Sequence, residues 1–583
     1  MKYPTLPVGK SSRETVEGFM GYNHNHRIAD GEFFEMENMS SEELPVLSPR
    51  KPRGVMLRGE KLTGVTYVDN FGLVYTDGPE LRSLNGVRLP MELSEAPKRF
   101  IQFGAYVVIW PDMKYFNTQI LQDYGDIGHA VQATQGEASF SLCDPEGEAY
   151  SNVTVSDTAP DTGTLWLDTS GTPHTLRRYV QASGEWVAVS STCVKITAPG
   201  IGGSGMFNRD DTVFLSGITA EGAQHLNGTA VLMKQPALNT IVVAGILDKT
   251  VTQDCAVSPI GVARRVPVMD HIIEAGNRLW GCRYGKNSDG VMVNELYASR
   301  LGDFKNWESF QGISTDSWAA SVGSPGAFTG AVNLGGYPVF YKENMKHKVW
   351  ISDTGAHQVT STSCDGVKSG CGGSVATVDG VAIYKSNRGF CLDDGSVPTP
   401  IGQCFGNREY SGARGHGYRN KYYVSMRDEE GGQHLFVYDT RKALWCREDD
   451  LNVVCFCRCW AVDADTNTLL DLPGDTQRSQ MEGPVSWMVQ TGDLGLSLPD
   501  RKYISRLTVR MSLDIGTEVS FYARYDHEDK WLELGSVHGS SLRTFSLPVR
   551  PRRCDHLRLM IRGTGMARIY SITKTMEQGS ELP

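Results

Sequence analysis

Short alternating segments separated by turn residues recur along almost the whole chain, and this pattern constrains the fold more than any other feature. Residues 62–68, 72–76 and 99–103 are rich in Val, Tyr, Phe and Thr, and Asp77-Gly78 supplies a turn after the second segment. Branched and aromatic residues with a period of two are typical of half-buried strands, whereas hardly any segment shows helical periodicity of useful length. The pattern therefore predicts an all-β protein.

The same strand-and-turn texture returns at a spacing of roughly 40 to 50 residues. Later examples are residues 336–342, 380–385 and 421–425. One small sheet cannot bury both of its faces alone, so several sheets must pack around an axis, as the blades of a β-propeller do. We expect about six blades, formed by residues 55–124 and 256–480. A solenoid or a stack of sandwiches is the competing arrangement.

Three further regions depart from this texture. Residues 125–255 are rich in Thr, Ser, Gly and Asp, and alternating strands such as 212–215 predict a small inserted β-sandwich. Residues 481–583 alternate polar and apolar side chains, which predicts a separate C-terminal β-sandwich. Residues 1–54 contain Pro45, Pro49 and Pro52, which forbid a helix there, so we expect an extended N-terminal arm that straps onto a neighbouring subunit.

Charge and composition argue against several classes of protein. The net charge of −10 over 583 residues argues against a basic nucleic-acid-binding surface, although an acidic wall lets DNA pass without sticking to it. We find no apolar run long enough to span a membrane, and residues 1–21 lack the apolar core of a signal peptide. The 13 scattered cysteines indicate synthesis in a reducing cytoplasm with free thiols.

Cys455, Cys457 and Cys459 form the densest cysteine cluster, with Cys446 nearby. At alternate positions of one strand, the three side chains would share a face and either pack as small hydrophobic groups or ligate zinc. Structural zinc sites normally use knuckles in which about two to four residues separate the cysteines and turn the chain around the metal. The alternating spacing lacks that turn, which favours a row of buried thiols.

Two other motifs contain residue types that occur in catalytic or metal-binding sites. Residues 299–307 are similar to the Ser-x-Asp-x-Gly-x-x-Trp turn of sialidase-type propellers, which is a structural hairpin even in those enzymes. Catalysis there also needs an arginine cluster and a tyrosine paired with an acid, and no such arrangement is recognisable. His24-Asn25-His26 favours solvated or turn-bonding side chains over a metal site. We therefore predict no catalytic, cofactor-binding or metal-binding residues, and a chain that is not an enzyme.

Three blocks of the sequence resemble proteins of phages and prophages of Gram-positive bacteria that are commonly labelled packaged-DNA stabilisation or tail-hub proteins. The first block begins at Gly21-Tyr22-Asn23 and ends at Leu47-Ser48-Pro49-Arg50. The second begins at Gly276-Asn277-Arg278-Leu279-Trp280-Gly281 and ends at Thr315-Asp316-Ser317. The third begins at Arg553-Cys554-Asp555-His556 and ends at Ile569-Tyr570-Ser571-Ile572. The likeness covers nearly the whole chain except the insert at 125–255.

The resemblance implies a β-propeller nozzle, or hub, of a short phage tail, a structural virion protein that forms a homohexameric ring. It implies that this ring lies below the portal–adaptor and head-completion proteins and meets tail fibre, spike or needle proteins. The ring would retain packaged double-stranded DNA and conduct it non-specifically at ejection, without stable membrane association. The protein would belong to the virion tail after assembly in the bacterial host cytoplasm. The family has no active-site residues to carry over.

Two other functions stay open on the sequence alone. A receptor-binding or carbohydrate-binding tail protein is the main alternative, because sandwiches and propellers with many Trp and Tyr residues often bind sugars. A propeller enzyme that cleaves glycans is the other. A trimeric state or glycan binding would favour the first of these, and turnover of a sialoside or polysaccharide would favour the second.

Overall fold

The computed structural model describes residues 11–203, 206–287, 289–497, 501–526, 528–539, 542–549 and 552–578. Nearly all its regular elements are strands, and the helices are short 3₁₀ turns such as η2 (Gln224–Leu226), η3 (Gly372–Ser374) and η4 (Gln403–Phe405). The prediction of an all-β protein is therefore confirmed. Over the described ranges, no helix has both the length and the hydropathy needed to cross a membrane.

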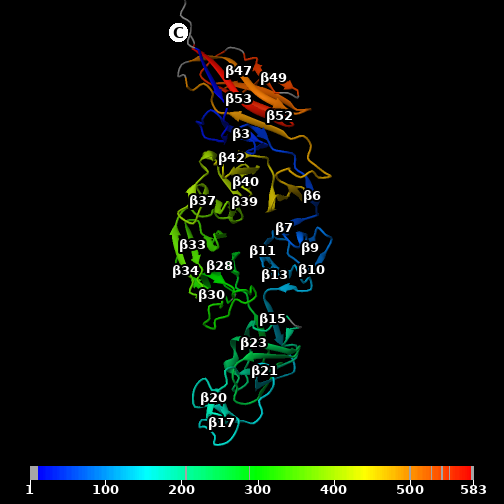
Figure 1. Cartoon of the computed structure of the whole chain (residues 1–583), viewed down its shortest axis with the longest axis vertical. Coiled ribbons are helices and arrows are strands. Elements are labelled where there is room, and N and C mark those ends of the chain that lie inside the picture. The colour runs from blue at the N-terminus through cyan, green and yellow to red at the C-terminus, as the bar shows by residue number, and fades with distance from the viewer. Residues whose placement is uncertain are drawn as a thin grey trace, which may run out of the picture.

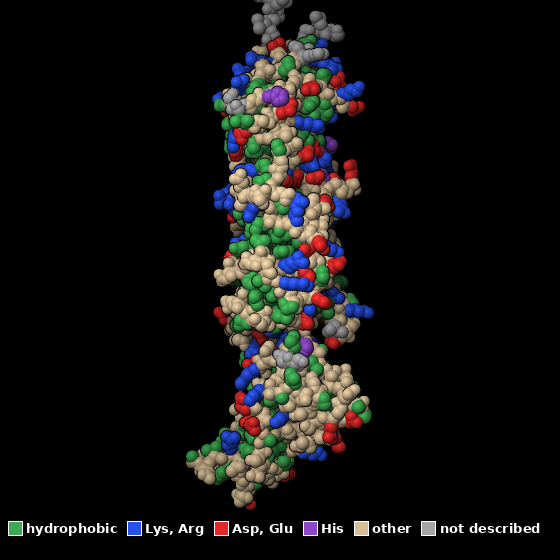
Figure 2. Space-filling view, turned by 90° about the vertical axis from the view of Figure 1, so that its right-hand side faces the viewer, with side chains coloured by type: hydrophobic (Ala, Val, Ile, Leu, Met, Phe, Trp, Pro, Cys, Tyr) green, Lys and Arg blue, Asp and Glu red, His purple; other side chains and the backbone are tan. Residues whose placement is uncertain are grey.

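The molecule is an elongated rod of three tiers, which we call the sandwich, the ring and the insert (Figures 1 and 2). The sandwich lies at the end that carries the C-terminus, the ring lies in the middle, and the insert forms the other end. On the face shown in Figure 2, acidic and basic side chains are interspersed over the sandwich and the ring.

Of the eight four-stranded sheets that the described residues form, seven belong to the ring and the eighth to the insert. The first two sheets consist of β7 (Leu62–Val68), β8 (Gly72–Asp77), β9 (Glu80–Ser83), β10 (Arg88–Glu92), and β11 (Arg99–Phe103), β12 (Tyr106–Trp110), β13 (Lys114–Asn117), β14 (Tyr124–Asp126). The next two consist of β27 (His271–Ala275), β28 (Arg278–Lys286), β29 (Met292–Ala298), β30 (Trp318–Ser321), and β31 (Gly330–Leu334), β32 (Tyr337–Tyr341), β33 (Met345–Trp350), β34 (Gln358–Ser363).

The remaining three sheets complete the circle seen in Figure 1. They consist of β35 (Ala376–Val378), β36 (Val381–Ser386), β37 (Gly389–Asp393), β38 (Thr399–Pro400); β39 (Tyr410–Tyr418), β40 (Lys421–Asp428), β41 (Gln433–Asp439), β42 (Leu444–Arg447); and β43 (Val453–Cys457), β44 (Trp460–Asp463), β45 (Thr468–Asp471), β6 (Val55–Arg58). The last sheet takes its fourth strand, β6, from the chain that precedes the first sheet, so both ends of the ring segment meet there.

The first strands of successive sheets touch one another in a cycle. β7 contacts β11, β11 contacts β27, and the series continues through β31, β35, β39 and β43 until β43 contacts β7. Separate hydrophobic clusters fill the gaps between neighbouring sheets, for example around Phe116 between the first two and around Trp280 between the third and fourth. The apolar interior of the ring is therefore divided into cores between neighbouring sheets.

The sandwich is built from two sheets and includes strands from both ends of the chain. One sheet contains β1 (Ser11–Val16), β53 (Ala567–Gln578), β47 (Lys502–Leu513), β50 (Arg543–Leu547) and β51 (Arg553–Cys554). The other contains β2 (Gly21–Tyr22), β3 (Glu32–Glu37), β46 (Ser486–Thr491), β52 (Leu557–Thr564), β48 (Glu518–Tyr525) and β49 (Leu532–His538). The described part of the N-terminal segment thus pairs with strands of its own chain.

The insert lies between β14 and β27. Its main sheet contains β15 (His129–Ala133), β16 (Glu137–Cys143), β21 (Cys193–Thr197), β22 (Thr212–Ser216), β23 (Gly228–Ala237), β24 (Thr240–Ala244), β25 (Val251–Asp254) and β26 (Ile260–Arg264). A smaller sheet contains β17 (Val153–Ser156), β18 (Leu165–Asp168), β19 (Thr175–Val180) and β20 (Glu185–Ala188). Phe140, Val194 and Ile241 belong to the core of the main sheet.

A buried ion network fastens the sandwich to the ring, just after β4 (Met39–Ser40) and β5 (Ser48–Pro49). Arg53 is 0% exposed and donates to Asp449 at 2.5 Å and to Glu448 at 2.6 Å, both of which follow β42. Its backbone N–H donates to Glu482, which precedes β46. Burial raises the pKa of Glu448, whereas Arg53 and Arg50 outweigh burial and hold the pKa of Asp449 below its ordinary value.

Candidate functional site

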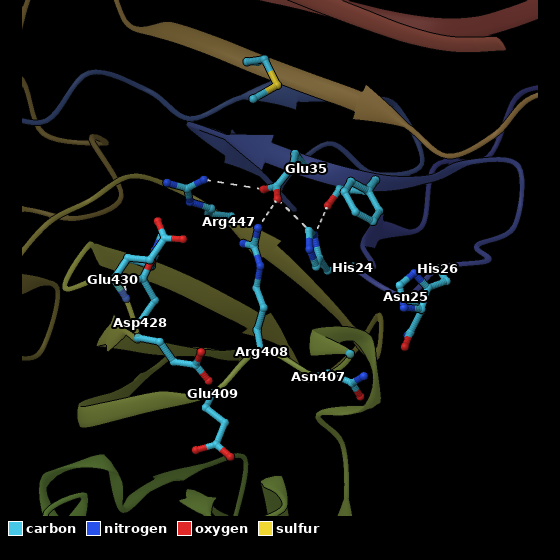
Figure 3. A pocket seen from close by; sticks show the side chains of 15 residues that line it. His24, Asn25, His26, Glu35, Asn407, Arg408, Glu409, Asp428, Glu430 and Arg447 are labelled. Atoms are coloured by element: carbon cyan, nitrogen blue, oxygen red, sulfur yellow. Dashed lines mark hydrogen bonds and ion pairs between the residues drawn. The ribbon is translucent and has the colours of Figure 1, made fainter. Parts of the chain in front are cut away.

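A cleft of about 610 Å³ opens where the base of the sandwich meets the ring sheet β39–β42 (Figure 3). Side chains from β3, from the loops before β39 and after β40, and from β42 reach into it. The lining residues that carry polar chemistry are His24, Asn25, His26, Glu35, Asn407, Arg408, Glu409, Asp428, Glu429, Glu430, His434 and Arg447. The cleft therefore combines residues that are hundreds of positions apart in the sequence.

A bulge in β3 aims two consecutive side chains into this cleft. Phe33 pairs with Thr491 and Glu35 pairs with Gln490, so Phe34 is the extra residue between them. A bulge of this kind bends the strand and re-aims its side chains. Both Phe34 and Glu35 line the cleft as a result, although they are neighbours on a strand and would otherwise point to opposite faces.

Glu35 is the centre of the charged cluster in Figure 3. Its carboxylate lies 2.8 Å from Arg408 Nη2, 3.1 Å from His24 Nδ1 and 3.8 Å from Arg447 Nη1. Burial acts to raise the pKa of Glu35, but the His24 hydrogen bond and Arg408 together hold it below its ordinary value. Glu35 is therefore ionised near neutral pH and has no proton to donate as a general acid. Its ion pairs give it a structural role.

The rim of the cleft is acidic. Asp428 accepts a hydrogen bond from His434 Nε2 at 2.6 Å, and burial lowers the pKa of His434, which is 8% exposed. Glu429 and Glu430 are exposed and form no ion pair within the described part of the chain. Glu35 is paired with basic side chains inside the cleft, whereas the rim carries the carboxylates of Glu429 and Glu430. The cleft therefore suits a polar or cationic group better than an anion.

His24-Asn25-His26 lies at the edge of this cleft and behaves as a turn. His24 Nδ1 donates to the Phe34 carbonyl oxygen at 2.9 Å, and its ring lies 4.0 Å from the Phe34 ring. Asn25 Nδ2 donates to the Gln403 carbonyl oxygen at 2.9 Å, which ties the arm to the ring. The described residues include no group of three or more His, Cys, Asp or Glu side chains placed to hold a metal ion.

The structure separates the cysteines that the sequence groups together. β43 ends at Cys457, and Arg458, at a φ of 51°, turns the chain with Cys459 before β44 begins. Cys455 and Cys457 pack with the cluster around Leu62 and Val65, and burial raises their pKa values to about 12 and about 11. Cys446 belongs to a different core. The three cysteines therefore do not form one row on a single strand, because a two-residue turn intervenes.

The sialidase-like segment 299–307 forms part of the loop between β29 and β30 and joins the ring to the insert. Asn306 is 1% exposed, and its side-chain oxygen accepts a hydrogen bond from the Thr212 backbone N–H at 2.8 Å. The buried Trp307 indole donates to the Phe304 carbonyl oxygen at 2.9 Å. The segment has a structural role at this joint.

Sequence reasoning missed the Glu35 cluster, because no local pattern links β3 to residues near 408 and 447.

No family model and no curated protein matches the chain. Solved structures with some likeness include an exo-β-1,3-galactanase from Phanerochaete chrysosporium in complex with galactose, at 9% identity and a TM-score of 0.20, covering 53% of this chain and 96% of that one. Another is an arabinoxylan arabinofuranohydrolase of glycoside hydrolase family 43 from Bacillus subtilis, at 10% identity and a TM-score of 0.13, covering 66% of this chain and 93% of that one.

These matches correct one prediction. The structures that the chain resembles are glycoside hydrolases, so the prediction that it is not an enzyme is contradicted and is withdrawn. At these TM-scores the likeness assigns neither a reaction nor a substrate to this chain.

Proposed function

We propose that this chain is one subunit of the ring-shaped hub, or nozzle, of a phage tail, which retains packaged DNA and conducts it at ejection. The observation that carries the proposal is where the three phage-like sequence blocks lie in the structure. Residues 21–50 join the sandwich to the ring, residues 276–317 include the loop that holds the insert, and residues 553–572 close the sandwich. All three blocks thus lie in the sandwich and the ring, outside the insert.

The cyclic arrangement of sheets supports a β-propeller for the middle tier. We infer seven blades instead of about six, because β6 completes a last sheet that cannot be counted from consecutive strands. The cavity at the centre of this ring has a volume of about 390 Å³, which accommodates a small molecule and not a DNA duplex. The proposal therefore requires the DNA channel to lie between subunits, with six rods side by side around it.

The net charge of −10 agrees with a channel that DNA passes without sticking. The partners in this proposal are further copies of the chain, the portal–adaptor proteins, and tail fibre, spike or needle proteins. The rod offers two ends for such contacts, one formed by the sandwich and the other by the insert.

Electron microscopy of the purified protein, alone and mixed with the portal–adaptor complex of its phage, tests the proposal. We expect sixfold rings with an open channel that dock on the distal end of the adaptor. Monomers or trimers that ignore the adaptor would overturn it.

A receptor-binding or carbohydrate-binding tail protein is the second candidate, and one surface feature favours it. Trp350 is 42% exposed and lies 4.9 Å from the Tyr337 ring, with Lys348 Nζ 4.0 Å above the indole. Exposed aromatic faces of this kind stack on sugars. Glycan-array binding that Trp350→Ala abolishes, in a chain that forms no sixfold ring, would favour this candidate. Release of reducing sugar in the same assay would identify a glycan-cleaving enzyme.

A further inference from the structure

The centre of the ring contains a cavity of about 390 Å³ that the tail-hub proposal does not use. Five of the seven sheets line it, through β11, β27, β31, β39 and the segment around β35. Its polar lining side chains are Arg99, Gln102, Glu274, Asn333, Thr377 and His416. The cavity is within the size range of pockets that hold small ligands.

Arg99 is the cation of this cavity, and it has no partner. It is the first residue of β11, its side chain is solvent-exposed, and no hydrogen bond or ion pair to it occurs in the described ranges. The surrounding ring nevertheless removes most of the bulk water, and this burial lowers the pKa of Arg99. Arg99 is therefore a solvent-accessible cation in a cavity that is open to water.

In this respect Arg99 differs from the buried arginines of the chain. Arg264 donates to Asp211 at 2.6 Å, and Arg53 binds two carboxylates. Arg278 donates to the backbone carbonyl oxygens of Ser299, Ser314 and Asp316. The unpaired guanidinium of Arg99 faces the cavity and is available to a ligand of opposite charge.

The neighbouring side chains do not neutralise Arg99. Glu274 is the one carboxylate among the lining residues, and it accepts a hydrogen bond from the Asn277 backbone N–H at 3.1 Å instead. Burial lowers the pKa of His416 to about 4, so this imidazole is neutral at pH 7. Its ring stacks on Phe456, with the ring centroids 5.8 Å apart. The cavity therefore contains one fixed positive charge that no lining residue neutralises.

We infer that the ring centre binds a small oxyanion, the carboxylate or phosphate group of a ligand no larger than a sugar, on the guanidinium of Arg99. The planar fork of arginine matches both groups in a bidentate geometry, which a lysine does not. The volume excludes a nucleic-acid duplex, so the ligand is a small molecule.

Isothermal titration calorimetry of the whole chain at low ionic strength tests this inference. The probes are inorganic phosphate, D-glucuronate as a sugar carboxylate, and glucose as the neutral control. We expect one anion site per chain, and binding to weaken about tenfold or more in Arg99→Gln, because a charge-assisted hydrogen bond is lost. Arg88→Gln is the matched control, since Arg88 is exposed and paired with Glu80 on the outside of the ring.

Tighter binding of phosphate or of glucuronate would identify which oxyanion the site prefers. Arg99→Lys should bind the anion less tightly than the natural chain. Equal binding of glucose, binding unchanged in Arg99→Gln, or no binding of either anion would overturn the inference. If neither variant folds, phenylglyoxal modification of the natural protein replaces them. The anion should then slow modification of Arg99, seen by mass spectrometry, and an unchanged rate would count against the site.

Discussion

Two interior arginines, one at the joint between sandwich and ring and one at the ring centre, have opposite surroundings. Arg53 is 0% exposed and shares two carboxylates, and three segments of the chain converge on it. Arg99 is enclosed by the ring, open to a cavity and without a carboxylate partner among the described residues. In the first arrangement pairing offsets the free energy that the buried charges lose on leaving water, whereas in the second only water in the cavity solvates the charge.

The difference separates residues that hold this molecule together from residues that are available to bind something. A charged side chain that is already paired within the protein is not available to a ligand. Glu35, which contacts His24, Arg408 and Arg447, is an example. A charge that the fold surrounds but leaves unpaired reduces stability, and such positions concentrate at functional sites.

Replacement of Arg53 by methionine should have the largest effect on stability. Arg53→Met leaves Glu448 buried without its ion-pair partner and leaves Asp449 paired with Arg50 alone, which should lower the free energy of unfolding by about 3–5 kcal/mol. Chemical denaturation followed by tryptophan fluorescence measures this. Arg88→Met, which breaks an exposed pair, is the control and should cost less than about 1 kcal/mol. Equal losses in the two variants would show that the joint is not held by this network.

Acidification should weaken the ring through its buried histidines. His347 is 0% exposed between the hydroxyls of Ser324 and Ser361, and burial together with Lys342 lowers its pKa to about 4. Between the ordinary histidine pKa and about 4 the unfolded chain binds a proton that the folded chain does not, so stability falls as the pH falls. The loss attributable to His347 should be on the order of 2 to 3 kcal/mol by pH 4.5.

Denaturation of His347→Gln at pH 7 and pH 4.5 isolates this contribution. The variant should lose less stability than the natural chain over that interval, whatever its stability at pH 7. His538→Gln serves as the control, since it makes the same replacement at an exposed position. Parallel pH profiles for all three proteins would contradict the assignment.

Removal of the charge on Glu35 should have a smaller effect, confined to the cleft. Glu35→Gln keeps the shape of the side chain but leaves Arg408 and Arg447 without a carboxylate, and should cost about 1–2 kcal/mol. Arg408 is partly exposed and water can compensate it, which limits the loss. Glu429→Gln on the rim of the same cleft should change stability by less than about 0.5 kcal/mol. A larger loss of unfolding free energy in Glu429→Gln would show that Glu429 takes part in a stabilising interaction at the rim.

The sequence predicted the local structure of this molecule better than its long-range contacts. β7, β8, β11 and β40 lie where period-two alternation places them, because that pattern reflects burial of one face. No local pattern indicates that β6 joins a sheet whose other strands lie about four hundred residues later. The Glu35 cluster and the lone Arg99 have no local signature, since both depend on which strands the ring and the sandwich bring together.

Replacement of Arg99 should have the smallest effect on stability and the clearest effect on binding. The side chain of Arg99 makes no hydrogen bond or ion pair with any described residue, so Arg99→Gln removes no internal contact of that kind and should change the free energy of unfolding by less than about 0.5 kcal/mol. Removal of an uncompensated charge should, if anything, raise it. Denaturation with and without phosphate or glucuronate measures both quantities, because a bound anion stabilises only a protein that retains its site. A natural chain stabilised by the anion beside an Arg99→Gln chain that is not would establish Arg99 as a binding residue. A strong loss of stability without ligand would instead place Arg99 with Arg53, as part of the framework.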